Sequence, residues 1–301
     1  MSTLRYLLVS MRPKQWSKNL LIYVALGLSI NEAWTLSNSV YAAWLFAMET
    51  VGFVLFCCVT SSEYLVNDIA DMKRDQAHPR KRLRPLPSGR LPRSYAIAAA
   101  IVLPAVALPL SWMLRPGFGV VLGSYFVMML AYTFFLKHVV IMDVLTIAAG
   151  FVLRAVAGGI IIAVPISPWL YICTALAALF LGLAKRRAEL VVLENGSGQH
   201  RRTLEDYSLV LVDQMIAVVA SSALVAYGLY TFSAPNLPSN HAMMLTIPFA
   251  LYAILRYLYL IHARNEGGSP EETLLSDIPM VLDVILWGVA AVFVLVFFRT
   301  A

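Results

Sequence analysis

Residues 40–66 read VYAAWLFAMETVGFVLFCCVTSSEYLV, and the chain continues as NDIADMKRD over residues 67–75. The first stretch is apolar over more than the about 20 residues that a helix needs to cross a bilayer. The second stretch carries three carboxylates where such a helix would leave the membrane. This junction predicts a membrane protein with a polar site at one membrane surface.

The composition of the whole chain agrees with this. Of its 301 residues, 60% are apolar and 13% are charged, against about 45–50% and about 25% in soluble domains. A globular protein of this length has too little interior to hide so much apolar surface. The composition therefore excludes a soluble domain, a disordered chain, a disulfide scaffold and a nucleic-acid binder, and it indicates that lipid is the main solvent.

Nine apolar runs are candidates for transmembrane helices, and turn residues such as Pro and Gly separate most of them. They predict an all-α, polytopic membrane protein formed as a single domain over residues 1–301. The first run is the weakest, because its apolar part is short. The predicted spans are 17–36, 40–66, 94–113, 117–136, 139–163, 168–186, 207–232, 241–262 and 278–298.

The basic residues predict the orientation, because Lys and Arg accumulate on the cytoplasmic side of a membrane protein. With nine spans and the N-terminus inside, nearly all of the 23 Lys and Arg fall on the cytoplasmic side. If the number of spans were wrong by one, every later loop would lie on the opposite side of the membrane and this asymmetry would be lost. We therefore expect a cytoplasmic N-terminus, an external C-terminus and two long cytoplasmic loops near 67–93 and 185–206. The exceptions are Arg115, Arg154, Arg256 and Arg299.

Asp68, Asp71 and Asp75 are spaced three and four residues apart, which places them on one face of a helix. Neighbouring like charges on a helix cost free energy, so an ordinary solvated face would mix the signs. Mg²⁺ is bound by one or two carboxylates together with waters and phosphate oxygens of the substrate. With the amide oxygen of Asn67, the row is a candidate site for Mg²⁺ on a diphosphate.

A basic loop follows this row and contains the candidate phosphate ligands Lys81, Arg82 and Arg84. Arginine binds phosphate through two parallel hydrogen bonds, and lysine acts as a point charge. The alternative is that the carboxylates and the basic side chains only neutralise one another in a salt-bridge network.

A second charged group, Lys185, Arg186 and Glu189, ends the predicted sixth span. Lys185 and Glu189 are four residues apart and are expected to pair on the helix surface. The basic residues would either bind phosphate or only anchor the helix in its orientation. Since spans two and six both end on the cytoplasmic side, we expect the two groups to contribute to one cavity.

Asp143 and Arg154 lie within the predicted fifth span, about three helical turns apart and too far from each other to pair. An ionisable side chain at membrane depth normally faces the protein interior or a wet cavity. Arg154 therefore requires an anion from the ligand or from the protein. The sequence leaves open whether Asp143 binds a ligand or is structural.

The motif Asn67-Asp68-x-x-Asp71-x-x-x-Asp75, the nine spans and the basic loop resemble the UbiA-type superfamily of intramembrane prenyltransferases. The resemblance covers nearly the whole chain. It implies a UbiA-like helix bundle around a central cavity, in which Asp-rich helices bind a diphosphate through Mg²⁺.

One departure from the superfamily pattern indicates the branch. Typical aromatic prenyltransferases carry a second Asp-rich motif near the end of span six, where residues 185–190 here read KRRAEL. Residues 12–19, 78–85 and 153–159 also resemble the decaprenyl-phosphate phosphoribosyltransferase branch. That branch takes 5-phosphoribosyl 1-diphosphate as donor and a polyprenyl phosphate as acceptor, and makes the precursor of lipid-linked arabinofuranose for cell-wall synthesis.

The resemblance implies a multi-pass enzyme of the bacterial inner membrane with a cytoplasmic active site. It implies Mg²⁺ bound by Asn67 and by the catalytic residues Asp68, Asp71 and Asp75, and it places Arg154 at the acceptor phosphate. The substrate-binding residues that it implies are Lys14, Asn67, Lys81, Arg82, Arg84, Tyr132, Lys137, Arg154, Lys185, Arg186 and Glu189.

Two other functions are alternatives. A UbiA-type enzyme could instead move a prenyl group from prenyl diphosphate to an aromatic or other acceptor, although the second Asp-rich helix is missing. A transporter is the other alternative, but transporters place ionisable groups near the midplane and contain inverted repeats. Here the charges concentrate at the membrane surface.

Overall fold

The computed structural model describes residues 3–79, 81–165, 167–194, 206–234, 237–264 and 267–298. Over these residues the chain is helical, and its β-structure is limited to an isolated bridge between Ile30 and Trp34. The chain forms two compact units. The first comprises Met1–Ala25, Ala43–Val139 and Leu153–Val164, and the second comprises Leu26–Ala42, Val140–Val152 and Pro165–Ala301.

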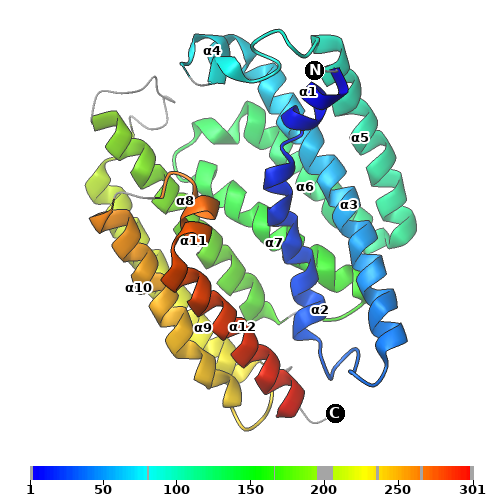
Figure 1. Cartoon of the computed structure of the whole chain (residues 1–301), viewed down its shortest axis with the longest axis vertical. Helices are drawn as coiled ribbons and strands as arrows, with labels where there is room; N and C mark the ends of the chain where they lie inside the picture. Colours follow the sequence, from blue (N-terminus) through cyan, green and yellow to red (C-terminus); the bar gives the residue numbers. More distant parts are fainter. Residues whose placement is uncertain are drawn as a thin grey trace. The chain divides into compact units, whose positions relative to one another are not determined.

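The first unit is built around the long helix α3, which runs beside α5 (Figure 1). The hydroxyl of Ser62 on α3 donates to the carbonyl of Ala100 on α5 at 2.6 Å. Its elements are α1 (Thr3–Ser10), η1 (Pro13–Tyr23), α3 (Ser39–Ala70), α4 (Met72–Ala77), η2 (Lys81–Leu83), α5 (Arg93–Leu114), α6 (Pro116–Phe134), η3 (Leu136–His138) and the second half of α7 (Met142–Ile162).

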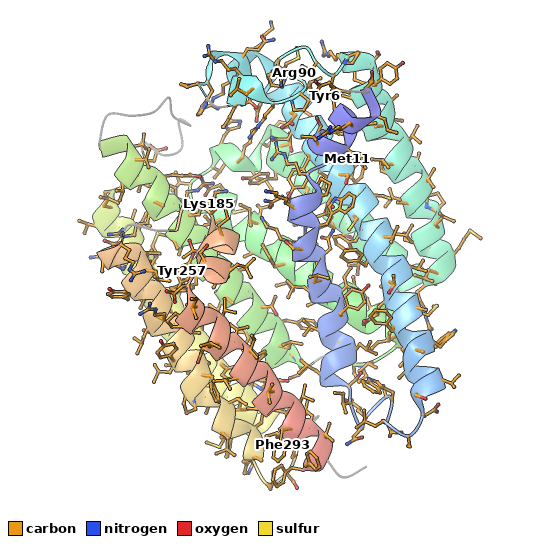
Figure 2. All side chains as sticks on the ribbon, in the orientation of Figure 1. Tyr6, Met11, Arg90, Lys185, Tyr257 and Phe293 are labelled. Carbon is orange, nitrogen blue, oxygen red and sulfur yellow. The ribbon has the colours of Figure 1, made fainter. Side chains whose placement is uncertain are left out.

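Two packing features hold the N-terminal segment in this unit. Tyr6 and Met11, labelled in Figure 2, pack against a buried cluster that includes Leu65 and Leu91. Farther along, Gly158 of α7 lies so close to the backbone of η1 that an added Cβ would stand 2.0 Å from the carbonyl oxygen of Ile22. Glycine is therefore required at this helix contact, in agreement with the close packing that small residues allow between membrane helices.

The second unit contains the C-terminal helices, among which α10 packs against both α9 and α12 (Figure 1). Its core joins Val144 of α7 to side chains of α8, α9 and α10, including Leu183, Ile216 and Tyr257. Its elements are α8 (Pro168–Glu194), α9 (Leu209–Ser233), η5 (Ala242–Thr246), α10 (Ile247–Ala263), α11 (Pro270–Ser276), α12 (Ile278–Phe297) and the first half of α7; α2 (Val24–Leu28) joins the two units.

Local capping explains where two of these helices begin. The Ser208 hydroxyl accepts from the backbone N–H of Leu211 at the start of α9, and the Asp277 carboxylate accepts from Met280 at the start of α12. Such side-chain acceptors satisfy backbone donors that a first helical turn leaves without partners.

Within the part of the chain that the structure describes, eight helices are long and apolar enough to cross a membrane, and they correspond to the second to ninth predicted spans. The predicted first span differs, because residues 13–28 form η1 followed by the five-residue α2. The all-helical, multi-pass character of the chain is thus confirmed, and the number of nine spans stays a prediction. Part of the second predicted loop is also helical, because α8 continues to Glu194; residues 195–205 lie outside the described residues.

Candidate active site

The predicted acidic row lies where α3 ends and α4 begins. The sequence predicts one uninterrupted helix, but α3 ends at Ala70 and α4 starts at Met72, with Asp71 between them at φ −90° and ψ 3°. This correction has a consequence for the carboxylates. Asp68 and Asp75 approach one arginine, whereas Asp71 contacts a lysine from another element.

Asp68 and Asp75 meet at the guanidinium of Arg84. Its Nη1 lies 3.3 Å from Oδ1 of Asp68 and 2.6 Å from Oδ2 of Asp75. Arg12 forms a second ion pair with Asp68, and the ammonium of Lys81 lies 3.9 Å from Asp75. The two carboxylates are buried, with 2% and 4% of their side chains exposed, whereas Arg12 and Arg84 are 27% and 31% exposed. The acids are therefore fixed inside the site and the cations reach them from its edge.

Asp71 is neutralised by Lys137 of η3, which is itself buried. The Lys137 ammonium donates to both carboxylate oxygens of Asp71, at 2.9 and 3.0 Å, and lies 3.5 Å from the amide oxygen of Asn67. A buried lysine is costly unless it is paired, so Asp71 and Asn67 compensate its charge. We call the group of Asp68, Asp71, Asp75, Arg12, Arg84 and Lys137 the acid cluster.

The acid cluster also bears on the predicted metal. Among the described residues, no three His, Cys, Asp or Glu side chains are grouped so that they could hold a metal ion by themselves. Mg²⁺ needs only one or two carboxylates when the substrate supplies phosphate oxygens. Oxygens of Asp68 and Asp75 already converge on one positively charged nitrogen, so their donor chemistry fits a hard cation that arrives with a diphosphate.

These ion pairs are those that the salt-bridge alternative predicts. The burial of the acids nevertheless distinguishes the cluster from a solvated network of surface charges, which contributes little to stability. Of the other predicted residues in the first unit, Lys14 and Arg82 have exposed side chains and Tyr132 is half-buried.

Arg154 lies in a separate buried network of the first unit. Its Nε donates to the amide oxygen of Asn19 at 2.7 Å, and its Nη2 donates to the hydroxyl of Tyr125 at 2.8 Å. The guanidinium also lies 5.3 Å from the ring centre of Phe56. Polar, aromatic and acidic groups of the protein thus surround the arginine, because the buried Glu63 hydrogen-bonds Tyr125 and interacts electrostatically with Arg154, and Asn19 ties the arginine to η1.

The second predicted group lies on α8, and Arg186 is its buried member. Lys185, labelled in Figure 2, is exposed. Arg186 forms one ion pair with Glu189 through Nη1, and a second with Asp143, whose Oδ2 lies 2.9 Å from Nε. Glu189 therefore pairs with Arg186, and not with Lys185 as its spacing predicts.

Tyr207 completes this second group. Its hydroxyl donates to Oδ1 of Asp143 at 3.0 Å and accepts from the backbone N–H of Ile141 at 2.7 Å. Burial raises the pKa of Tyr207 to about 12, so the hydroxyl keeps its proton at any working pH. We call Asp143, Arg186, Glu189 and Tyr207 the Arg186 cluster.

Comparison with known proteins identifies the family. The sequence profile of the UbiA prenyltransferase family matches residues 20–276. The chain belongs to the UbiA prenyltransferase family. The predicted resemblance is therefore confirmed.

Relatives within the UbiA family also support the predicted branch. The chain is 34% identical to the decaprenyl-phosphate phosphoribosyltransferase of Mycolicibacterium smegmatis, over 93% of this chain and 89% of the relative. It is 31% identical to the Corynebacterium glutamicum protein of the same name, over 92% of this chain and 83% of that protein. A solved UbiA homolog from Archaeoglobus fulgidus, bound to GPP and Mg²⁺, has the same fold, with a TM-score of 0.71 and 17% identity over 97% of this chain and 99% of that one.

Arg12 of the acid cluster and Tyr207 of the Arg186 cluster are absent from the sequence-based predictions, and the sequence leaves the role of Asp143 open. The sequence could have indicated Arg12 as a site residue, because it lies two residues before the predicted ligand Lys14. A buried charge in the first turn of a span, as at Asp143, also indicates a missing partner. Tyr207 gives no such signal, because its contact with Asp143 joins positions 64 residues apart.

Proposed function

We propose that this chain transfers 5-phosphoribose from 5-phosphoribosyl 1-diphosphate to a polyprenyl phosphate of decaprenyl type, releasing diphosphate. The observation that carries the proposal is the 34% identity, over nearly all of both chains, to an enzyme named decaprenyl-phosphate phosphoribosyltransferase. The charge of the second group supports it. A donor with a 5-phosphate as well as a diphosphate needs more cationic ligands than a prenyl diphosphate does, and α8 presents Lys185 and Arg186.

In this proposal the acid cluster binds the diphosphate end of the donor. Asn67, Asp68, Asp71 and Asp75 would hold Mg²⁺, which when bound neutralises charge on the departing diphosphate. The partly exposed Arg12 and Arg84 would leave the carboxylates and donate to phosphate oxygens, as charge-assisted hydrogen bonds favour. The further proposed diphosphate ligands are Lys14, Lys81, Arg82, Tyr132 and Lys137.

The reaction itself is a displacement at the anomeric carbon of ribose. The bond from this carbon to the diphosphate oxygen breaks, and its electron pair leaves with the diphosphate. An oxygen of the acceptor phosphate forms the new bond. Because that phosphate is already anionic at neutral pH, the step requires no strong general base. Fixed cations near the departing charge are expected to provide the largest part of the catalysis.

Binding residues for the phosphoribosyl end of the donor and for the acceptor phosphate are assigned from their charge. We propose that Lys185, Arg186 and Glu189 bind the phosphoribosyl end of the donor. Arg154 is proposed as the contact of the acceptor phosphate. Its bonds to Asn19 and Tyr125 would then orient it for that anion.

The direct test uses purified protein in lipid nanodiscs, with labelled 5-phosphoribosyl 1-diphosphate, decaprenyl phosphate and MgCl₂. We expect lipid-extractable label that depends on both substrates and disappears when EDTA removes the divalent cation. Absence of lipid-extractable label from protein that is shown to be folded would refute the proposal.

A second candidate function is the transfer of a prenyl group, which the family name and the GPP-bound structure favour. The same assay distinguishes it when labelled geranyl diphosphate replaces the phosphoribosyl donor. Label that enters lipid or an aromatic acceptor only from the prenyl donor would establish this alternative.

We also propose that residues 1–301 act as one transferase domain in the bacterial inner membrane, with nine spans and a cytoplasmic N-terminus. The basic residues support this topology through the positive-inside rule. Labelling of single cysteines with a membrane-impermeant maleimide in intact cells tests it. A cysteine placed at exposed Lys14 should stay unlabelled until the cells are opened, and labelling in intact cells would refute the orientation.

A further inference from the structure

Asp143 is one of the most buried charged residues of the second unit, yet it is not among the proposed ligands. It is 1% exposed and lies in the first turn of α7. One oxygen faces Nε of Arg186 at 2.9 Å, and the other accepts from the hydroxyl of Tyr207 at 3.0 Å. A carboxylate that accepts a hydrogen bond at one oxygen and forms an ion pair at the other has little rotational freedom, so it restricts the guanidinium with which it pairs.

Tyr207 connects this pair to the backbone. Its hydroxyl accepts from the N–H of Ile141 at 2.7 Å. Ile141 has a φ of +69°, in the left-handed region that β-branched residues rarely adopt. The turn before α7 therefore has an unusual backbone geometry at the point where it presents this N–H to Tyr207.

The resulting chain of contacts ends on the arginine. It runs from Ile141 through Tyr207 and Asp143 to Nε of Arg186, and Glu189 holds Nη1. Arginine has a planar, fork-shaped group that binds phosphate in a fixed orientation. A guanidinium that is already oriented loses less conformational entropy when it binds an anion.

We propose that Asp143 and Tyr207 are positioning residues, which hold the guanidinium of Arg186 in the orientation that binds a phosphate of the donor. The inference rests on the proposed function, in which Arg186 binds the phosphoribosyl end. It assigns Asp143 and Tyr207 an effect on donor affinity without direct contact with the substrate.

The next residue of α8 offers a matched control. Arg187 forms an ion pair with Asp213, with Nε and Oδ1 2.7 Å apart, and donates to the carbonyl oxygen of Ile261 at 2.8 Å. This pair also joins an arginine Nε to a carboxylate, but Asp213 is 36% exposed and lies 3.3 Å from Nε2 of His262, and the pair is not among the proposed ligands. Asp213→Asn should therefore leave the donor KM unchanged.

The experiment measures steady-state transfer in nanodiscs for Asp143→Asn, Tyr207→Phe and Asp213→Asn, each titrated separately with donor and acceptor. Asn keeps an oxygen that accepts from Tyr207, and Phe removes only the hydroxyl. We expect Asp143→Asn to raise the donor KM by about 10- to 100-fold and Tyr207→Phe by about 10-fold. The acceptor KM should stay unchanged and kcat should stay within about threefold.

A double-mutant cycle separates positioning from general stability. In an Arg186→Gln background, Asp143→Asn should raise the donor KM no further, because the group that it orients is gone. Additive effects would overturn the inference, as would an unchanged donor KM in both Asp143→Asn and Tyr207→Phe. If Asp143→Asn does not fold, Tyr207→Phe decides alone. A wild-type chain that does not transfer from this donor would overturn the proposed function and the inference together, whereas normal wild-type transfer with unaffected variants overturns only the inference.

Discussion

In the acid cluster the most buried partners are carboxylates, whereas in the Arg186 cluster an arginine is buried together with its carboxylate. Asp68 and Asp75 expose 2% and 4% of their side chains, and Arg84, which joins them, exposes 31%. In the other cluster Arg186 exposes 5% and Asp143 exposes 2%. The two clusters contain similar residues but differ in which charges are able to move.

This difference suits two different tasks. In the proposed function, fixed acids would hold the metal while the cations at the edge turn toward the incoming anion. In the proposed function, a fixed arginine suits the phosphate that stays on the ribose, because the position of that phosphate has to be the same before and after the reaction. Lys137 is the exception in the acid cluster, since it exposes 5% and Asp71 exposes 23%.

The largest effect is expected when the carboxylate of Asp68, one of the buried acids, is removed. Asp68→Asn keeps the size of the side chain but removes the charge that we propose as a metal ligand, so transfer should fall by about 1,000-fold or more. The measurement is the rate of label transfer at saturating donor, acceptor and MgCl₂. Asp213→Asn, which changes another ion-paired carboxylate, should retain full activity. Full activity of Asp68→Asn would show that the buried acids are not metal ligands.

The next largest effect is expected from replacing an arginine, and it should be larger for the buried Arg186 than for the partly exposed Arg84. Arg186→Lys should raise the donor KM by about 30- to 100-fold, because one ammonium replaces a fork that contacts Asp143, Glu189 and a phosphate at once. Arg84→Lys should raise it by about 10-fold at most, since an edge cation adapts to the anion. Donor titrations of both variants check the order. A reversed order would refute the distinction between the clusters.

Lys137→Met tests the role of Lys137, the buried cation of the acid cluster. Removal of the ammonium that holds Asp71 and Asn67 frees their oxygens for a metal, so the MgCl₂ concentration for half-maximal rate should fall severalfold. The turnover should fall by about 10-fold, because the proposed diphosphate site loses a cation. Titration of the transfer rate with MgCl₂ measures both quantities in one experiment. An increased demand for MgCl₂ would indicate that Lys137 supports metal binding instead of competing with it.

The sequence predicts the membrane-spanning helices well because their apolar runs are local signals. Among the described residues, the eight helices that are long and apolar enough to cross a membrane begin and end within a few residues of the predictions, except that α3 and α8 continue farther. The predicted first span lacks such a signal, since its apolar part is short and the backbone forms η1 instead.

The contacts within the site could be predicted only in part. The carboxylate spacing indicates three acids where the second span ends, and the structure places Asp68, Asp71 and Asp75 at the end of α3 and in the start of α4. The spacing does not predict that the helix is interrupted at Asp71. Because of this interruption Lys137 pairs with Asp71, and Arg84 pairs with Asp68 and Asp75. Pairings such as Asp143 with Arg186 join residues 43 positions apart, and such a contact depends on tertiary packing that no local pattern encodes.

The smallest expected effect concerns an ion pair outside both clusters. Arg256 binds Asp277 through two contacts, at 2.9 and 2.8 Å, and the hydrogen bond from Arg256 holds the pKa of Asp277 below its usual value. Because the pKa is lower in the folded state, the pair stabilises the protein above the unfolded-state pKa of about 3.9, and this stabilisation is lost as the pH falls through the folded-state pKa.

Asp277→Asn isolates this charge, because an asparagine oxygen can still accept from the N–H of Met280 and cap α12. At pH 7 the variant should have unchanged transfer activity and a Tm lower by about 2 °C. The difference in Tm should shrink as the pH falls through the lowered folded-state pKa of Asp277, where the wild-type carboxylate also becomes protonated. Thermal unfolding in detergent at several pH values measures it. A difference that persists unchanged at low pH would mean that Asp277 acts through packing, while a loss of transfer at pH 7 would extend the functional region beyond the two clusters.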